Sequence, residues 1–199
     1  KVKPGNSKYV DVNKDGVYND ADQGIIGCGQ PTFNWGWNNT FNYKNFDFSF
    51  FVVGFHGFDI YNATHQMGYN LIKSQQMAGV TPMRELLNRW TPTNTNTDIP
   101  GFVKGGTENK DFFSTRFVEN GSFIKMKSIT LGYTLPEATC RSLGINNLRV
   151  YASVQNPFHI TKYSGLDPEA TMGSPLVQGV DWGAYPNSRN YLIGLNFSF

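Results

Sequence analysis

The chain has 199 residues, of which 15% are aromatic and only 16% charged, and its formal net charge is +2. This near-neutral balance argues against a nucleic-acid-binding protein, which usually carries a clustered basic surface. The longest apolar stretch, 50–55, is far shorter than the roughly 20 residues of a membrane helix. Low hydropathy does not by itself indicate a soluble protein, because half of each strand in a membrane β-barrel faces water.

The sharpest motif lies in 1–30, a polar segment expected to be an extracellular loop. Counted from Asp11, oxygen-bearing side chains stand at the spacing of a twelve-residue calcium loop, with Gly16 at the turn position. The expected Ca²⁺ ligands are Asp11, Asn13, Asp15, the carbonyl of Val17, Asn19 and Asp22. Asp22 replaces the usual Glu, as in dockerin modules, and no helical pattern precedes the loop. The alternative is a polar turn rich in Asp, Asn and Gly.

Two alternating segments, 31–43 and 46–52, predict a β-hairpin closed by the short break Lys44-Asn45. Side chains of successive strand residues point to opposite faces, and aromatic residues here fall on one parity. Aromatics also gather at the short end of the hairpin, which is typical of the girdle of a membrane barrel. In a soluble β-sandwich the same hairpin would normally carry more Lys and Glu on its outer face.

A long connection, 59–111, follows the hairpin. A helical piece is expected within 63–87, and 83–90 is the likeliest helical turn. The polar run 91–100 is expected to have no regular structure. Such long connections are normal on the outer rim of a barrel.

The segment 122–135 predicts another strand, but Lys125 and Lys127 share the parity of its apolar residues. We therefore expect a β-bulge or a strand end that lies above the membrane. A turn region at 136–146 and a strand at 148–155 come next, followed by a second long loop at 156–188. Within that loop, Asp167 and Glu169 flank Pro168 and are expected to form a solvated turn.

The final segment, 189–199, alternates apolar and polar residues and ends on an aromatic, Phe199. An apolar terminal strand would invite aggregation at the edge of a small soluble sheet. It suits a barrel whose outer surface is lipid and whose interior is water.

The order of the connections is short, long, short, long, with the long ones at 59–111 and 156–188. This alternation separates the periplasmic turns of an outer-membrane barrel from its extracellular loops, and places the C-terminus in the periplasm. Five strands cannot close a barrel, since at least eight are needed. We therefore expect 31–199 to be the C-terminal barrel strands of a larger chain or assembly.

Six stretches in this order resemble the C-terminal part of SusC/RagA-type TonB-dependent outer-membrane transporters. They are DVNKDGVYNDADQGIIG, PTFNWGWNNTFNYKNFDFSFFVVGFHGFDIYN, LLNRWTPTNTNTDIP, RFVENGSFIKMKSITLGYTLP, LRVYASVQNPFHITKYSGLDPE and YLIGLNFSF. Together they cover nearly the whole chain. One small departure is Cys28-Gly29, where Asn-Pro is common, and it affects only loop geometry.

The resemblance implies an all-β fold, a 22-stranded antiparallel transmembrane barrel with an N-terminal plug, in the outer membrane. It implies TonB-driven import, a SusD-type surface lipoprotein as partner, and an oligosaccharide or peptide as cargo. The plug and the TonB contact lie outside the matched stretches, so no substrate-contacting residue is carried over. Phe199 resembles the terminal signal that the barrel-assembly machinery reads.

Two other classes of protein compete with the transporter assignment. The sequence contains no nucleophile-elbow, zinc-protease or Walker motif, and His56, His65 and His159 are scattered, so an enzyme is not expected. The stronger alternative is a secreted, calcium-stabilised carbohydrate-binding β-sandwich, in which Trp35 and Trp37 would stack on sugars. Cys28 and Cys140 could pair in an oxidising compartment or stay unpaired.

Overall fold

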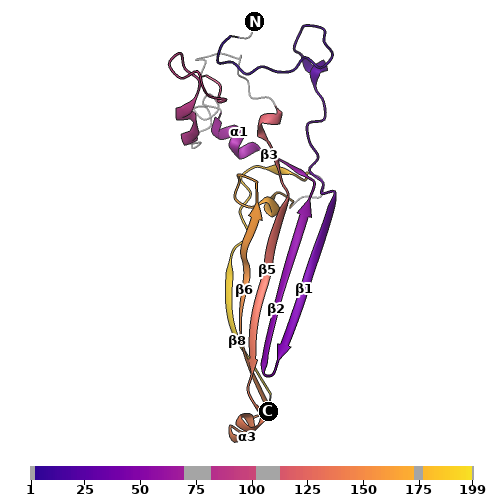
Figure 1. The fold of residues 1–199 in the computed structure, drawn as a ribbon, viewed down its shortest axis with the longest axis vertical. Helices are drawn as coiled ribbons and strands as arrows, with labels where there is room; N and C mark the ends of the chain where they lie inside the picture. The colour runs from indigo at the N-terminus through magenta and orange to yellow at the C-terminus, as the bar shows by residue number, and fades with distance from the viewer. Residues whose placement is uncertain (1–2, 70–81, 102–112, 173–176, 199) are drawn as a thin grey trace.

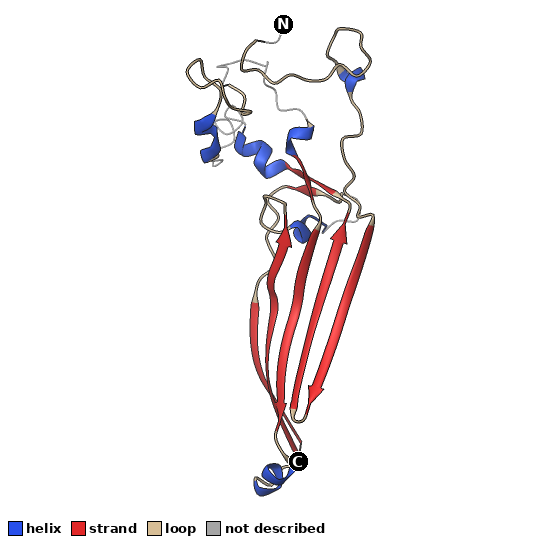
Figure 2. Ribbon diagram, in the orientation of Figure 1, coloured by secondary structure: helices blue, strands red, loops and turns tan. Residues whose placement is uncertain are grey.

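The computed structural model describes residues 3–69, 82–101, 113–172 and 177–198. Five long strands form one antiparallel sheet, which Figures 1 and 2 show as a tall, curved layer. In spatial order they are β1 (Phe33–Tyr43), β2 (Phe46–His56), β5 (Phe123–Thr134), β6 (Asn147–Thr161) and β8 (Asn190–Ser198). The all-β, antiparallel fold class predicted from the sequence is confirmed.

A second, small sheet lies at the end of the molecule away from the C-terminus (Figure 1). Its strands are β4 (Val118–Asn120), β3 (Asp59–Asn62) and β7 (Val180–Asp181), with β3 in the centre. Around them lie α1 (Ala63–Tyr69) and four 3-10 turns: η1 (Asp20–Asp22), η2 (Arg84–Asn88), η3 (Thr115–Phe117) and η4 (Pro168–Met172). The helix α3 (Glu137–Ser142) lies at the opposite end. Every helix within the described ranges is too short or too polar to cross a membrane.

The hairpin predicted from the alternating aromatics is confirmed. Tyr43 pairs with Phe46 across the turn at Lys44, which adopts a left-handed φ of 52°. The predicted aromatic cluster also forms at this short end, where the rings of Phe46 and Tyr133 lie 4.7 Å apart and those of Phe41 and Phe48 lie 6.3 Å apart.

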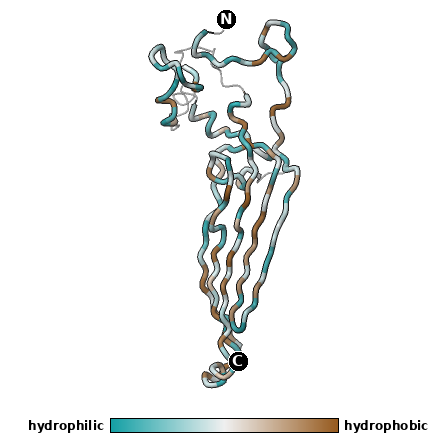
Figure 3. Tube along the Cα trace, in the orientation of Figure 1, coloured by the Kyte–Doolittle hydropathy of each residue, from teal (hydrophilic) through white to brown (hydrophobic). Residues whose placement is uncertain are grey.

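The strand register places most apolar residues of the five strands on one face. Directly paired residues share a face of a sheet, so the pairs Trp37–Val52, Phe48–Leu131, Leu131–Ala152 and Ala152–Ile193 trace this face across the sheet. The apolar side chains on it are Phe33, Trp35, Trp37, Phe41, Tyr43, Phe46, Phe48, Phe50, Val52, Ile124, Met126, Ile129, Leu131, Tyr133, Leu148, Val150, Ala152, Val154, Phe158, Ile160, Tyr191, Ile193, Leu195 and Phe197. Figure 3 shows the resulting alternation of hydropathy along the strands.

The opposite face is largely polar, and we call it the polar face. It carries Asn34, Asn38, Thr40, Asn42, Asp47, Ser49, Ser128, Thr130, Arg149, Ser153, Gln155, Asn196 and Ser198, with Gly36, Gly132 and Gly194 among them. The buried core lies at the upper end of the sheet instead, where Phe58 and Ile60 pack on Phe123 and Tyr163. Many large side chains of the apolar face are exposed in this chain. A β-sandwich buries such a face under a second sheet, so this arrangement does not fit the alternative predicted above.

The predicted bulge is present at Lys127. Met126 and Ser128 each pair with a residue of β2 and with a residue of β6. Lys127, which lies between them, pairs with no residue of either strand. One extra residue shifts the parity of the strand, because side chains alternate with period two. The bulge therefore moves Lys125 onto the polar face, where it pairs with Val53 and His159.

One predicted boundary is wrong. The loop expected from residue 156 begins later, because β6 continues to Thr161. Pro157 lacks a backbone N–H, and it lies where β6 and β5 lose their regular register, opposite the Lys127 bulge. The long connections also contain regular structure, since β3, α1 and η2 lie within 59–111 and η4 and β7 within 156–188.

The expected helical piece at 63–87 is partly confirmed by α1, and 83–90 contains the short 3-10 turn η2. Part of the first range lies outside the described residues, and so does Phe199. Cys28 is exposed and Cys140 is buried, and both are free thiols.

Candidate functional site

The polar face carries an ion pair that joins β2 to β6 across the intervening strand β5. Arg149 on β6 donates from Nε to Asp47 Oδ1 on β2 at 2.8 Å and from Nη2 to Oδ2 at 2.5 Å. Gly132 of β5 lies between them, and a Cβ there would collide with both charged groups. Tyr151 also holds the guanidinium, whose carbon lies 5.0 Å from the ring centre. The polar face is thus lined by fixed, mutually neutralising charges.

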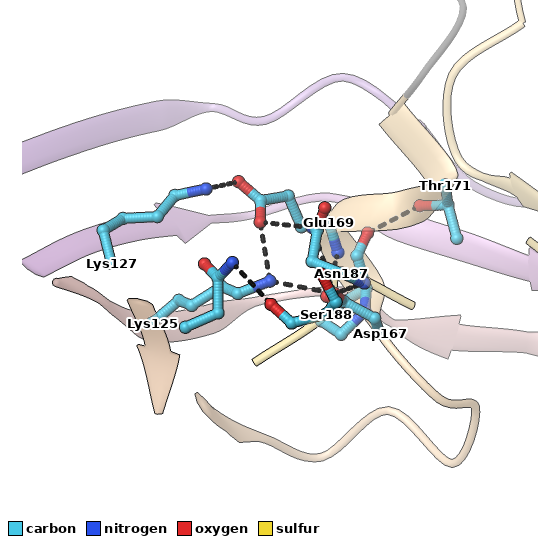
Figure 4. Close-up of polar contacts among 9 residues, drawn as sticks. Lys125, Lys127, Asp167, Glu169, Thr171, Asn187 and Ser188 are labelled. Atoms are coloured by element: carbon cyan, nitrogen blue, oxygen red, sulfur yellow. Dashed lines mark hydrogen bonds and ion pairs between the residues drawn. The ribbon is translucent and has the colours of Figure 1, made fainter. Parts of the chain in front are cut away.

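A buried group of charges, which we call the Lys125 cluster, fastens the loop after β6 to the polar face (Figure 4). The Lys125 side chain is 2% exposed, and its Nζ donates to Asp167 Oδ2 at 2.8 Å and to Glu169 Oε2 at 2.7 Å. Lys127, the bulge residue, pairs with the other oxygen of Glu169. A buried charge is tolerable only when it is paired and hydrogen-bonded, and each member of this cluster is.

Asn187 joins the same cluster from the far end of the loop. Its backbone N–H and side-chain Nδ2 donate to Asp167 Oδ2 at 3.1 and 3.2 Å, and Nδ2 also donates to Glu169 Oε2 at 2.9 Å. Burial acts to raise the pKa of Asp167 and of Glu169, but the hydrogen bonds from Lys125 and its neighbours outweigh it and lower both pKa values. Both carboxyl groups are therefore held ionised.

The expectation of a solvated turn at Asp167 and Glu169 is wrong, because Asp167 is buried against Lys125. One feature of the sequence pointed to this contact. Lys125 and Lys127 lie within an apolar strand, and a lysine that is buried there needs acidic partners. The sequence did not indicate that those partners stand 42 and 44 residues away, or that Asn187 joins them.

A second buried contact orders the turn after β7. Tyr163 donates from its hydroxyl to Asp181 Oδ2 at 2.5 Å, and Asp181 Oδ1 accepts the backbone N–H groups of Gly183 and Ala184 at 2.8 and 3.0 Å. Burial raises the pKa of Tyr163, and the neighbouring carboxylate of Asp181 raises it further. The turn projects two exposed aromatic side chains, Trp182 and Tyr185.

Glu119 of β4 links the small sheet to the loop and to α1. It accepts hydrogen bonds from Asn62 Nδ2 at 2.9 Å and from the backbone N–H and hydroxyl of Ser164, both at 2.8 Å. His65 lies between two carboxylates, with Nδ1 3.6 Å from Glu119 and Nε2 3.3 Å from Glu85. These contacts give His65 a structural role at the junction of α1, η2 and β4.

The six residues of the calcium-loop motif lie on one tightly wound loop. Asp11 accepts the backbone N–H groups of Asp15 and Gly16 at 3.2 and 2.8 Å, and Gly16 adopts the expected left-handed φ of 83°. Asp22 returns to the start of the loop, where it accepts the N–H of Val12 at 2.8 Å.

The remaining oxygens of the motif also accept hydrogen bonds from the loop itself. Asn13 Oδ1 accepts from the N–H of Asp15 at 3.0 Å, Asp15 Oδ1 from that of Val17 at 2.7 Å and Asn19 Oδ1 from that of Ala21 at 2.7 Å. Within the described part of the chain, no three His, Cys, Asp or Glu side chains gather closely enough to hold a metal ion.

An open pocket of about 1310 Å³ lies beside this loop, at the end of the molecule away from the C-terminus. Its wall includes the calcium-loop segment, through Val12 and Tyr18, and the small sheet, through Tyr61. Trp90 and Ile99, from the long connection between β2 and β5, also line it.

Comparison with known proteins gives a consistent result, although no family model matches the chain. It is 36% identical, over 98% of its length, to TonB-dependent receptor P3 of Formosa agariphila, and 32% identical, over 99%, to TonB-dependent receptor SusC of Bacteroides thetaiotaomicron. The fold matches the RagAB peptide importer in its closed-closed state with a TM-score of 0.76 and 28% identity over 96% of the chain. The chain spans about a fifth of these proteins, 18 to 20% of their lengths.

Proposed function

Because this chain is homologous to a part of the SusC/RagA-type TonB-dependent receptors, we propose that it forms barrel strands of an outer-membrane nutrient importer. Its relatives are named as receptors and transporters, which agrees with the expectation that it is not an enzyme. The proposed role of this part is to supply barrel wall and extracellular loops, with no catalytic chemistry.

The continuous apolar face is the observation that carries this proposal. Among the described strand residues that the register places on it, and apart from tyrosines, its only polar side chains are Asn39 and His56. The other face is rich in amides, hydroxyls and paired charges. A membrane barrel needs this division, because its outer surface contacts lipid and its interior contacts water. A sheet of a soluble protein would leave this large apolar area to be covered by another layer.

The proposed orientation places the C-terminus in the periplasm. The two short connections, at Lys44-Asn45 and around α3, lie at the C-terminal end of the sheet in Figure 1, and the long connections lie at the other end. Outer-membrane barrels have short periplasmic turns and longer extracellular loops. The small sheet, the calcium-loop segment and the pocket beside it would then be extracellular.

The proposed cargo is an oligosaccharide or, as the alternative, a peptide. The proposed partners are a SusD-type surface lipoprotein at the extracellular end and TonB in the periplasm. One relative of known structure is described as a peptide importer, whereas another relative carries the name SusC. TonB would act through regions of the importer that this chain does not match.

We also propose that the loop from Asp11 to Asp22 binds Ca²⁺ as a structural ion. The proposed ligands are Asp11, Asn13, Asp15, the Val17 carbonyl, Asn19 and Asp22. Support comes from their spacing, from the left-handed Gly16 and from the contact of Asp22 with Val12, which brings the two ends of the loop together. Each carboxylate oxygen that accepts one N–H keeps a lone pair for the ion.

The experiment that tests the proposed function uses the full-length protein recovered from its own cells. We expect it in the outer membrane, with heat-modifiable migration, a co-purifying lipoprotein, and uptake that stops when TonB is deleted. Uptake is measured with fluorescently labelled oligosaccharides and with a labelled tryptic peptide digest. A soluble secreted product would overturn the proposal and favour the calcium-stabilised carbohydrate-binding protein.

A further inference from the structure

The loop between β6 and β8 is fastened twice at one point of the polar face. Its first part enters the Lys125 cluster through Asp167 and Glu169, and its last part enters through Asn187. Both ends of the segment 167–187 therefore meet at β5, and Figure 4 shows these side chains converging on Lys125. The described residues between them, 177–186, are also held by the pairing of β7 with β3 and by the hydrogen bond from Tyr163 to Asp181.

Opening the cluster would be costly. It would separate one fully buried lysine from two carboxylates and leave at least one charge unpaired in a site of low dielectric. A segment held in this way behaves as a fixed wall, whereas a moving lid is normally drawn from weakly packed, solvent-exposed structure.

The fastened segment keeps two aromatic rings in contact with solvent. Trp182 is 60% exposed and Tyr185 is 88% exposed. The turn that carries them is nevertheless held by hydrogen bonds from the backbone N–H groups of Gly183 and Ala184 to Asp181. Tyr185 is two residues from Asn187, so it lies beside the point where the segment meets the polar face. The charges of the Lys125 cluster, which Asn187 joins, pair with one another.

We propose that residues 177–187 are a fixed part of the entry wall and that Trp182 and Tyr185 contact the cargo by ring stacking. This proposal rests on the proposed function, since it takes the polar face to be the lumen of an importer. Aromatic rings beside hydrogen-bonding groups and balanced charge suit a neutral polymer with apolar C–H faces, as an oligosaccharide has. The Lys125 cluster acts on the cargo only by positioning these two residues.

The first test asks whether the segment stays in place during transport. Lys127→Cys and Glu169→Cys are introduced together in a Cys28→Ser background of the full-length importer, and a short bis-maleimide joins β5 to the loop. Lys125 and Asp167 keep their own contact in this variant. We expect cross-linked protein to import the fluorescent oligosaccharides at the rate of the same variant without cross-linker. Loss of import upon cross-linking would show that the segment must move, and would overturn the fixed-wall proposal.

The second test asks whether the rings contact cargo. The double variant Trp182→Ala/Tyr185→Ala is expected to raise the KM for uptake about tenfold, since two stacking contacts, each worth about threefold in affinity, are lost. Outer-membrane abundance should not change. The matched control is Leu166→Ala, an exposed apolar residue of the same loop that lies before both fastenings.

The outcomes separate this proposal from the proposed function. If the wild-type importer takes up neither probe in a TonB-dependent way, the proposed function fails, and this inference fails with it. If wild-type uptake occurs and the double variant leaves KM unchanged, only the inference is overturned. If the double variant instead reduces co-purification of the lipoprotein at unchanged KM, the two rings are a partner contact, and the cargo assignment is wrong.

Discussion

At the scale of single residues, the surroundings of Lys125 determine whether a lysine is tolerated at this position of β5. On the parity expected without a bulge it would point into lipid, where a lysine at the membrane midplane costs about 2–4 kcal/mol. In the structure it is buried on the polar face between Asp167 and Glu169. Because these two carboxylates come from the loop after β6, the buried lysine attaches that loop to β5.

The pH dependence of this fastening follows from its carboxylates. The pKa values of Asp167 and Glu169 are lowered from their ordinary values of 3.8 and 4.5. Their contribution to stability is therefore fully present above those values and is lost as the pH falls through the lowered pKa values. We expect residues 167–171 and 177–187 to stay protected from hydrogen exchange at pH 5 to 8 and to lose protection in stronger acid.

The measurement is hydrogen exchange followed by mass spectrometry, corrected for the intrinsic pH dependence of exchange. A variant with Lys125→Met, Asp167→Asn and Glu169→Gln removes the two buried charges and the partly buried charge of Glu169 together, and this segment should then show the same protection at every pH. Equal pH profiles in the variant and the wild type would contradict the assignment to these carboxylates.

At the scale of elements, the bulge at Lys127 decides which residues of β5 face which side. Met126 and Ile129 share the apolar face although they are three positions apart, a spacing that places residues of a regular strand on opposite faces. The irregular region at Pro157 on β6 accommodates the same bulge from the neighbouring strand.

Deleting Lys127 should therefore leave the two faces of β5 unchanged. Met126 and Ser128 already lie on opposite faces, so the shortened strand alternates regularly and Lys125 stays on the polar face. We expect the deletion variant to assemble in the outer membrane and to lose the contact with Glu169, as Lys127→Ala does. Heat-modifiable migration in purified outer membranes is the measurement. Loss of assembly in the deletion variant but not in Lys127→Ala would show that the bulge itself is required.

The calcium-loop segment is an element whose order is expected to depend on an ion. Asp15→Ala removes one proposed ligand and the hydrogen bond to the N–H of Val17. We expect it to abolish Ca²⁺ binding and to make residues 3–27 sensitive to protease, and a chelator should do the same to the wild-type protein. The control is Asp20→Ala, since Asp20 belongs to the loop but is no proposed ligand. If chelation leaves the protease sensitivity of wild-type protein unchanged, there is no structural calcium here.

At the scale of the whole molecule, the main sheet is a single layer with opposite chemistry on its two faces. The described part of the chain covers neither face over most of its length, and its buried core is confined to the upper end. Such a sheet is stable only when lipid covers one face and other strands continue its edges, which is the environment of a membrane barrel.

Two neighbouring residues of β8 test this division directly. Ile193 lies on the apolar face and is 85% exposed in this chain, whereas Leu192 lies on the polar face and is 42% exposed. Ile193→Lys should cost about 2–4 kcal/mol in lipid and lower the yield of heat-modifiable protein, whereas Leu192→Lys should be tolerated. The comparison is made in the full-length protein in outer membranes. Equal tolerance of both substitutions would argue that Ile193 faces water.

The sequence alone determined the five long strands, their two faces, the hairpin at Lys44 and an irregularity near Lys125, which it left open as a bulge or a strand end. These features follow from period-two alternation and turn chemistry, which are local and can be read within about ten residues. It did not determine that β6 passes through Pro157, because a neighbouring strand supplies the irregular register there.

Only the tertiary structure decided which polar groups meet. Asp47 and Arg149 are 102 residues apart, and Lys125 finds partners in a loop that was expected to be solvated. Contacts of this kind depend on strand order, on register and on the path of a long loop. No local pattern encodes these, because the pairing of two distant charges leaves the alternation around each of them unchanged.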